Sequence, residues 1–345
     1  MNQLRKEVSH TMNELYLGID LGGTKMLAAL VDGNGTIVAR TLQPTMAERG
    51  VEDVIDRLIS MADSLLSRHA PEAGKAAIRG IGIAVAGVLD PDQGTVVLAT
   101  NLGWKNVPIG RLLEERFRCP VRVLNDANAA ALGEWLAGAG AGSEDVVFVT
   151  VSTGIGGGIV SGGRLILGSS GSAGELGHIS IDRNGPPCPC GNRGCVELYA
   201  SGSAIARRVR EDVRGGDPRT SAILRKAGFE AERLTAQHVA AAAEEGDDYA
   251  RNVLADAGSA LGMGLVSIIH LANPNKVILG GGVTEIGDLL LAPMMETLRK
   301  YGIPEMVNQV AFDRAQLEGD AGAAGAALWW KYERMPVARH PRFSR

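Results

Sequence analysis

Cys188, Cys190 and Cys195 are three of the four cysteines of the chain, and they fall within eight consecutive positions. Thiols at such short spacing are typical of a metal site in a reducing compartment rather than of a disulfide framework. His178 lies ten residues before Cys188, so the four side chains can form a tetrahedral Cys3His zinc site. Because protein ligands would fill every position, the predicted zinc ion is structural. The alternative is a set of free reduced thiols, which would be prone to oxidation.

A glycine turn near the start of the chain could hold phosphate groups. Residues 20–25 read DLGGTK and lie between two apolar segments. The spacing does not match a Walker A loop, and a strand rather than a helix is expected to follow, which excludes a dinucleotide fingerprint. Backbone N–H groups in a glycine hairpin can still approach phosphate oxygens closely. Candidate ATP ligands are therefore Asp20, Gly22, Gly23, Thr24 and Lys25, with Asp20 placed to hold Mg²⁺; the alternative is a plain β-hairpin.

Two later glycine turns are further candidates for nucleotide binding. Residues 153–158 read TGIGGG, and a strand is expected on each side. This context favours a second phosphate clamp, formed by Thr153 and Gly154, over a dinucleotide fingerprint. Gly280, Gly281 and Gly282 follow an apolar segment and could form a flat floor for adenine or ribose, although a plain turn would explain them too.

Hydrophobic periodicity predicts an α/β protein whose strands and helices position these turns. The predicted strands are residues 15–20, 25–31, 36–42, 78–85, 121–124, 145–152, 158–160 and 276–279. The predicted helices are residues 51–69, 127–137, 236–244, 249–271 and 320–332. The strand–turn–strand at residues 145–160 echoes the one at residues 15–31, which predicts two similar α/β halves that face each other.

The chain of 345 residues is long enough for two lobes. We expect a polar leader at residues 1–14, an N-terminal lobe at 15–135 and a larger C-terminal lobe at 136–319 that carries the zinc loop, residues 178–195. The last helix, residues 320–334, is expected to pack back on the first lobe. Residues 335–345, rich in Arg and Pro, are expected to be a disordered basic tail.

Composition argues against several classes of function. The formal net charge is −4 and aromatic residues make up 4% of the chain, so neither a basic footprint nor stacking platforms for nucleic acid are evident. No run of about 18 apolar residues predicts a membrane-spanning helix, and the first residues lack the apolar stretch of a signal peptide. These features predict a cytoplasmic protein without nucleic-acid or membrane partners.

Together these motifs resemble the ROK family, named for repressors, open reading frames and kinases. The resemblance rests on the first hairpin, on TGIGGG, and on the combination of GELGH at residues 174–178 with CPCGNRGCVE at residues 188–197. It covers residues 15–328 in motif order. It implies an actin-like, hexokinase-type fold of the ribonuclease H-like class, with two lobes and a central cleft. It further implies ATP-dependent phosphorylation of a hexose at its 6-hydroxyl, most simply glucose, and assembly as a homodimer or homotetramer.

The resemblance also assigns residues around the sugar. Asp126 is implied as the general base, against the simpler interpretation as a helix N-cap. Residues similar to the family's sugar ligands are Gly87, Asn101, Asn125, Glu175, His178 and Glu197. One ring nitrogen of His178 could bind zinc while the other faces a sugar hydroxyl, so that the metal would fix the imidazole.

Two alternatives stay open at this stage. The substrate could be another hexose, such as N-acetylmannosamine, fructose, allose or mannose, because epimers differ by one hydroxyl. The family also includes sugar-responsive repressors, which carry a helix-turn-helix domain before the lobes. Only about fourteen residues precede the first predicted strand here, too few for three helices, so the kinase is the favoured interpretation.

Overall fold

The structure is a computed structural model that describes residues 14–69 and 78–335. Within these residues the chain forms two compact units. The first runs to Phe148 and takes in Gly158–Gly174 and the chain from Ala315 onward. The second consists of Val149–Gly157 and Glu175–Arg314.

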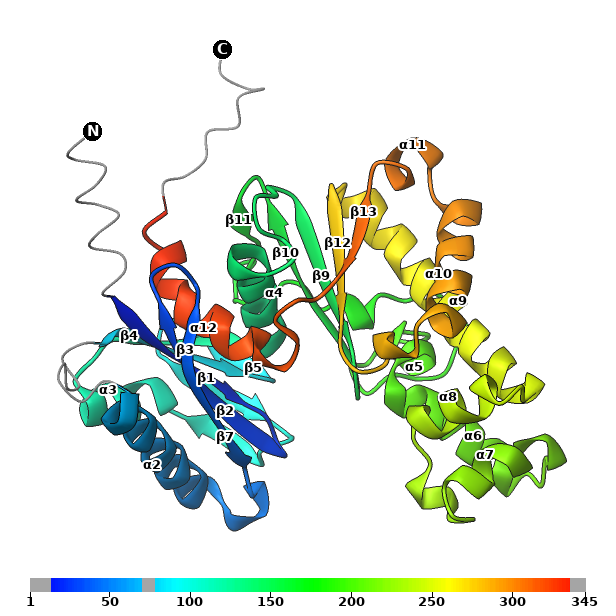
Figure 1. The fold of residues 1–345 in the computed structure, drawn as a ribbon, viewed down its shortest axis with the longest axis horizontal. Coiled ribbons are helices and arrows are strands. Elements are labelled where there is room, and N and C mark those ends of the chain that lie inside the picture. The colour runs from blue at the N-terminus through cyan, green and yellow to red at the C-terminus, as the bar shows by residue number, and fades with distance from the viewer. Residues whose placement is uncertain (1–13, 70–77, 336–345) are drawn as a thin grey trace. The chain divides into compact units, whose positions relative to one another are not determined.

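The first unit is built on a five-stranded mixed sheet with the strand order β3-β2-β1-β4-β8 (Figure 1). Antiparallel pairing joins β1, β2 and β3, while β4 runs parallel to both β1 and β8. A smaller antiparallel sheet follows, with the order β5-β6-β7. The strands are β1 (Leu15–Leu21), β2 (Lys25–Asp32), β3 (Ile37–Pro44), β4 (Ile78–Val85), β5 (Val88–Asp90), β6 (Thr95–Ala99), β7 (Trp104–Val107) and β8 (Val121–Asn125).

Helices cover both faces of the five-stranded sheet because its side chains alternate between two cores. Leu17, Ile19 and Leu21 of β1 share a core with α2 (Val51–His69) and α3 (Ile109–Phe117). Tyr16 on the opposite face shares a second core with Ala323 of α12 (Ala321–Tyr332). α12 also packs closely against α4 (Asp126–Ala137), so the C-terminal helix belongs to the first unit.

A second five-stranded sheet has the order β11-β10-β9-β12-β13. Its strands are β9 (Val146–Val151), β10 (Ile155–Ser161), β11 (Arg164–Leu165), β12 (Lys276–Gly280) and β13 (Ala311–Arg314). The helices of the second unit are α5 (Glu197–Ala200), α6 (Gly202–Arg214), α7 (Ser221–Lys226), α8 (Ala236–Glu244), α9 (Asp248–Ala272), α10 (Asp288–Tyr301) and α11 (Pro304–Val307). Among them α9 and α10 make the most extensive helix–helix contact.

α9 is the one helix in the described part of the chain that is long and apolar enough to cross a membrane. Its 18-residue window has a mean hydropathy of 1.5, and 67% of that window is buried inside the protein. α9 packs against α8 and α10, as the central helix of a globular core does. Its apolar composition is therefore not evidence that it spans a membrane.

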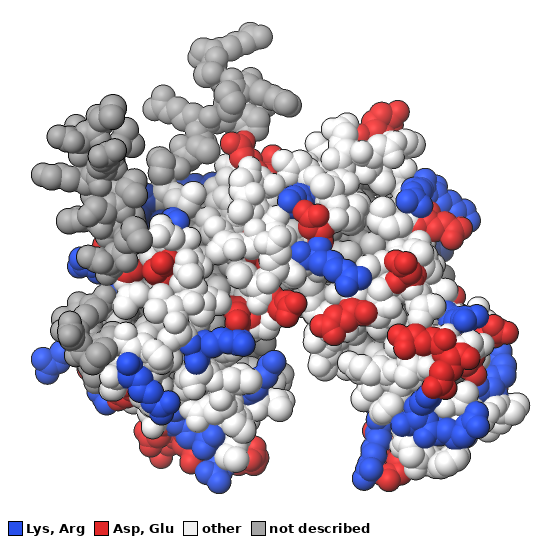
Figure 2. Space-filling view, viewed as in Figure 1, with Lys and Arg blue, Asp and Glu red and all other residues white. Residues whose placement is uncertain are grey.

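Side chains of both charges are mixed on the face of the protein shown in Figure 2. Arg208 pairs with Asp256 at 2.8 Å and Arg214 pairs with Glu232 at 2.6 Å, on the helical part of the second unit. Exposed pairs of this kind contribute only about 0–1 kcal/mol each to stability. Their effect is to neutralise positive charge locally.

Each predicted element is present, with bounds that shift by a few residues, whereas β5–β7, β11, β13, α3, α10 and α11 have no counterpart among the predicted elements. α2, α8 and β4 begin and end at the predicted residues. β10, however, begins at Ile155 rather than at Gly158. The strand continues through the glycines because the turn is tight, closed by the Ser152 N–H donating to the Gly154 carbonyl at 2.8 Å.

The compact units do not divide at residue 135, where the sequence predicts a lobe boundary. The Trp135 indole donates to the Ser143 carbonyl at 2.7 Å, which ties the chain beyond α4 to the first unit. The Leu165 N–H donates to the Tyr332 hydroxyl at 3.2 Å, which ties β11 to α12. The division into functional lobes stays a prediction. Apart from Glu14 and Met335, the predicted leader and tail lie outside the described residues.

Candidate active site and metal centre

The carboxyl ends of β1, β4 and β8 meet at one edge of the first sheet. Leu21 is paired with Val85, and Val85 with Asn125, so the three parallel strands end in register. In open α/β sheets this edge is the usual place for ligands, because the loops that follow the strands converge there. The register therefore brings three segments together: the hairpin between β1 and β2, which is the predicted phosphate site, the loop of Gly87, and the pair Asn125–Asp126.

Asp126 is the first residue of α4, and the helix is capped by its neighbour. The Asn125 side chain accepts hydrogen bonds from the N–H groups of Ala127 (3.0 Å) and Asn128 (3.1 Å). The cap role that competed with the catalytic interpretation thus belongs to Asn125, and the Asp126 carboxyl is not needed for it. Burial raises the pKa of Asp126 above the ordinary aspartate value.

A buried threonine, Thr45, stabilises the hairpin between β1 and β2 by two hydrogen bonds. The Gly22 N–H donates to the Lys25 carbonyl at 3.0 Å and closes the turn. Thr45 is fully buried; its hydroxyl donates to the Gly22 carbonyl at 2.6 Å and its N–H to the Thr24 carbonyl at 2.9 Å. Thr24 and Lys25 are exposed, so the tip of the hairpin is rigidly supported while its outer side is open to a ligand.

Asp20 lies at the end of β1, close to Asp126. Burial raises the pKa of Asp20 to about 6, the Asp126 carboxyl adds to the rise, and Lys25 opposes it. Two carboxyl groups that disfavour each other's ionisation form a site that a cation would stabilise. The arrangement suits a divalent cation brought in by a nucleotide.

Replacing Asp20 by Asn is expected to stabilise the protein when no nucleotide or Mg²⁺ is present. A carboxyl whose pKa is raised from 3.8 to about 6 costs folding free energy that grows as pH rises through this interval and is complete above it. The cost is on the order of 3 kcal/mol. Urea unfolding should show Asp20→Asn more stable than wild type at pH 8, with the difference shrinking towards pH 4. A difference that does not depend on pH would contradict this.

Asn101 and Gly87 both lie at this edge. Asn101 packs on the hairpin so closely that a Cβ built on Gly23 would come within 2.6 Å of the Asn101 carbonyl oxygen. Gly87 has a φ of 136° and leaves no room for a side chain, because a Cβ there would meet the Leu98 carbonyl oxygen at 2.2 Å. Both residues are exposed, and the structure places them beside the predicted phosphate site.

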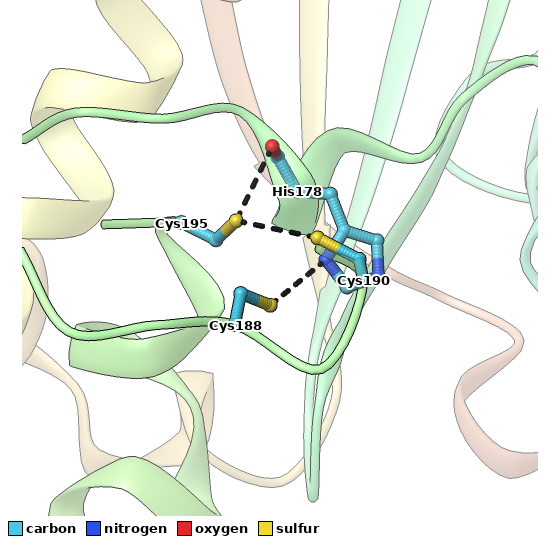
Figure 3. A group of neighbouring side chains, drawn as sticks. All are labelled: His178, Cys188, Cys190 and Cys195. Carbon is cyan, nitrogen blue, oxygen red and sulfur yellow. Dashed lines mark hydrogen bonds between the residues drawn. The ribbon is translucent and has the colours of Figure 1, made fainter. Parts of the chain in front are cut away.

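The His178 and cysteine side chains gather at one point in the second unit (Figure 3). Their ligand atoms all lie within 4.8 Å of one another. The Sγ atoms of Cys190 and Cys195 are 3.7 Å apart, and His178 Nδ1 is 3.7 Å from Cys188 Sγ. Two sulfurs on a tetrahedral zinc ion with bonds of about 2.3 Å would be about 3.8 Å apart. The donor set and spacing thus fit a tetrahedral metal ion.

The backbone of the loop shapes this cluster. The Cys188 N–H donates to the Asn192 carbonyl at 2.8 Å, and the Gly191 N–H to the Cys188 carbonyl at 3.0 Å. Gly194 has a φ of 63° and sits against the Asp182 carbonyl, which turns Cys195 back towards the others. Burial and the neighbouring thiols raise the pKa of Cys195 to about 12. A bound dication would reverse this effect, because it stabilises thiolates.

His178 presents its other nitrogen away from the thiols. Its Nε2 lies 4.0 Å from an exposed carboxyl oxygen of Glu175. Glu197 approaches from α5, and its Oε2 accepts a hydrogen bond from the Ile155 N–H at 2.7 Å. That bond leaves the other carboxyl oxygen of Glu197 for a ligand. The second unit thus presents a carboxyl group, an imidazole and another carboxyl group on neighbouring segments.

A hollow of about 220 Å³ lies in the second unit, between the turn after β9 and the starts of α6 and α8. Thr153 and Gly282, two predicted ATP ligands, line it. The first N–H groups of α6 already have partners within the protein: that of Gly202 donates to the Ser152 carbonyl at 2.8 Å and that of Ala204 to the Ser201 hydroxyl at 3.1 Å. Gly154 lies beside Glu197 rather than in the hollow, and Gly281 packs on the Val151 carbonyl. Lining residues that sequence reasoning missed are Ser152, Gly202, Ser203, Arg210, Thr235 and Gln237.

These candidate residues are divided between the two units. Asp20, Asn101 and Asp126 belong to the first, whereas His178 and Glu197 belong to the second. That residues of the two units converge on one bound sugar stays a prediction.

Two solved structures share this architecture over most of the chain. One is a ROK family glucokinase from Streptomyces griseus, in complex with glucose and AMPPNP; it is 35% identical, with a TM-score of 0.75, and the match covers 91% of this chain and 98% of that one. The other is a ROK hexokinase from Thermus thermophilus, 34% identical, with a TM-score of 0.78 and coverage of 93% and 100%. The fold is therefore that of the actin-like sugar kinases.

The sequence comparison narrows this class. The family described as "ROK family" matches residues 16–333, and the chain belongs to that family. Glucokinases from Halalkalibacterium halodurans and Thermotoga maritima are 37% and 38% identical to it, over 90% of this chain and 93% and 95% of theirs. A xylose repressor from Bacillus subtilis is 32% identical over 90% of this chain and 75% of the repressor.

Proposed function

We propose that the protein transfers the γ-phosphoryl group of ATP to the 6-hydroxyl of glucose. The proposal rests on one observation above all: a half-buried carboxyl group, Asp126, begins a helix beside a supported glycine hairpin and Asp20. Phosphoryl transfer needs an acceptor for the hydroxyl proton, groups that hold phosphate, and charge neutralisation, and this edge offers all three. Identity of 34–38% to glucokinases supports glucose as the substrate.

Each residue has a stated part in the proposed reaction. Asp126 accepts the proton of the sugar hydroxyl as the oxygen attacks, and Asn125 contributes its amide nitrogen to a neighbouring hydroxyl. The hairpin Gly22–Lys25 holds phosphate oxygens through backbone N–H groups. Asp20 holds Mg²⁺, which when bound neutralises charge on the phosphates. The hollow beside α6 takes the nucleoside.

The second unit is proposed to supply sugar recognition. Glu175 and Glu197 accept hydrogen bonds from sugar hydroxyls, as carboxyl groups do in a bidentate manner. His178 would hold a zinc ion through Nδ1 and offer Nε2–H to the sugar, and its ring and tautomer would then be fixed by this bond. Reduced thiols and a supply of ATP are both found in the cytoplasm, where we propose that the protein acts.

An ADP-release assay over a panel of hexoses tests this function. We expect turnover with glucose to require ATP and Mg²⁺, and kcat/KM for glucose to exceed that for mannose, fructose, allose and N-acetylmannosamine. A higher kcat/KM for one of the other hexoses would keep the kinase and correct the substrate. No sugar-dependent ADP release with any hexose would contradict the proposal.

A sugar-responsive regulator is the second candidate, because xylose repressors match the chain at 31–34% identity. Retention of the purified protein on DNA, changed by sugar and without ADP release, would favour this function over the kinase.

A further inference from the structure

The chain passes between the two compact units at four places: after Phe148, Gly157, Gly174 and Arg314. Two of these crossings carry glycine, and Gly174 has a φ of 96°. The crossings after Phe148 and Gly157 lie inside β9 and β10, whereas those after Gly174 and Arg314 lie outside the strands. Hinges are a few loop residues that absorb backbone rotation, so backbone motion would concentrate at these last two crossings. The chain beside a hinge must in turn be held in place, and side chains of α4 hold it within the first unit by hydrogen bonds.

Glu134, in the second half of α4, fixes the chain just after the last crossing. Its side chain is completely buried. One carboxyl oxygen accepts the Leu317 N–H at 2.6 Å, and the other accepts the N–H groups of Gln316 and Ala139, each at 3.0 Å. A buried carboxyl group is costly unless it is hydrogen-bonded, and here all its partners are backbone groups. None of these contacts belongs to the proposed reaction.

Asn128, in the first turn of α4, fixes the chain just before another crossing. It is 1% exposed, and its Nδ2 donates to the Ala173 carbonyl at 2.9 Å, next to Gly174. Gly158, which follows a third crossing, is in contact with the same helix: a Cβ there would come within 2.5 Å of Ala131 and 3.2 Å of Asn128 Oδ1. One helix thus touches the first-unit side of three of the four crossings.

The helix that holds these crossings also begins with Asp126. On its other side α4 packs against α12 so tightly that a Cβ on Gly325 would come within 1.7 Å of the Ala129 carbonyl oxygen. The start of α12 in turn lies against Asp20, because a Cβ on Gly322 would be 2.8 Å from Asp20 Oδ2. Both candidate acidic groups are therefore placed by the same pair of helices.

We propose that Glu134 and Asn128 are positioning residues that fasten the chain beside the crossings to α4, so that the Asp126 carboxyl at the start of this helix keeps its place when the crossings move. The inference rests on the proposed kinase function. Loosening either contact lets α4 shift against the chain at the crossing, which misplaces the Asp126 carboxyl. A small misplacement of this kind costs about 10- to 100-fold in rate.

Three variants test the inference, each acting differently. Glu134→Gln keeps the shape but replaces one accepting oxygen by a donor. Gly138→Ala leaves Glu134 intact but displaces it, because the new Cβ would lie 2.2 Å from Oε2. Asn128→Ala removes the bond to Ala173. The control is a substitution at Leu65, which is buried in α2 on the opposite face of the sheet. Of Leu65→Val and Leu65→Ala, the one used is the variant whose loss in Tm matches that of the three test variants.

We expect the three variants to lose about 10- to 100-fold in kcat at a temperature where all are folded. The Kd of ATP should change much less, because the hollow proposed for the nucleoside lies in the other unit. The Leu65 variant should keep kcat within about 2-fold, because it loses only packing. Turnover of all three variants equal to that control would overturn the inference. If the wild type shows no sugar-dependent ADP release, the proposed function fails first and separately.

Hydrogen exchange of the wild type gives a second test that needs no variant. We expect glucose to change exchange around residues 174–175 and 314–315, while the amides of residues 316, 317 and 139 stay protected with and without the sugar. Fast exchange at residues 316 and 317, or a change there as large as at the crossings, would overturn the anchoring role of Glu134.

Discussion

Asp126→Asn is expected to lower kcat for glucose phosphorylation by about 10²- to 10⁴-fold while the protein folds and binds glucose normally. The amide has the shape of the carboxyl group but cannot accept the hydroxyl proton. The helix should not suffer, because Asn125 makes the capping bonds. Loss of a negative charge in the first turn costs only about 0.3–1 kcal/mol, and relief from burying that charge opposes even this loss.

The measurement is steady-state ADP release together with glucose affinity by calorimetry and Tm by thermal unfolding. Asn101→Ala, at the same edge of the sheet, is a useful comparison, since it should weaken sugar binding without removing a base. The pH dependence adds a check: burial raises the pKa of Asp126, so the acid limb of kcat/KM should lie above the ordinary range of an aspartate. Turnover of Asp126→Asn close to wild type would remove this residue as the base.

The edge of the first sheet could be predicted because its residues are local in sequence. The hairpin, the loop of Gly87 and the pair Asn125–Asp126 each stand at the end of a strand, and parallel strands bring such ends together. The sequence offers an N-cap only as the alternative interpretation of Asp126, whereas the structure gives this role to Asn125, because a cap is decided by backbone geometry at the end of β8 and either residue type can provide it. The Cys3His cluster was equally predictable, since spacing within one loop limits how far its ligands can separate.

The hollow beside α6 and α8 shows where sequence reasoning stops. Ser152, Arg210 and Gln237 meet there although they lie far apart in the chain, and none belongs to a recognisable motif. Glu197 likewise accepts a hydrogen bond from the Ile155 N–H, although the two residues are 42 positions apart in the sequence. A signal was present at Ser201, a typical N-cap that marks the start of α6 and so places one wall of the hollow. The hydrophobic pattern fixes which elements form, but the meeting of loops depends on how sheets and helices stack.

The other large effect is expected at an exposed residue, Cys190. A substitution at an exposed side chain usually changes stability by less than about 0.5 kcal/mol. If Cys190 binds zinc with His178, Cys188 and Cys195, then Cys190→Ala removes a ligand from a site whose metal contributes on the order of 10 kcal/mol to folding of its loop. We therefore expect loss of zinc, a marked fall in Tm and loss of glucose binding, whereas ATP binding persists.

The cysteine outside the cluster provides the matched control. Cys119 is buried in the first unit, with its thiol directed at the Ile78 carbonyl, so Cys119→Ala costs packing but leaves the four ligands in place. It should retain zinc and glucose binding despite a lower Tm. The order of effects is opposite to what burial alone predicts, because without a metal the exposed Cys190 would matter less than the buried Cys119. Wild-type protein that contains no zinc, or a Cys190→Ala variant with normal Tm and glucose affinity, would show that the cluster is only a group of reduced thiols and that His178 is held by packing alone.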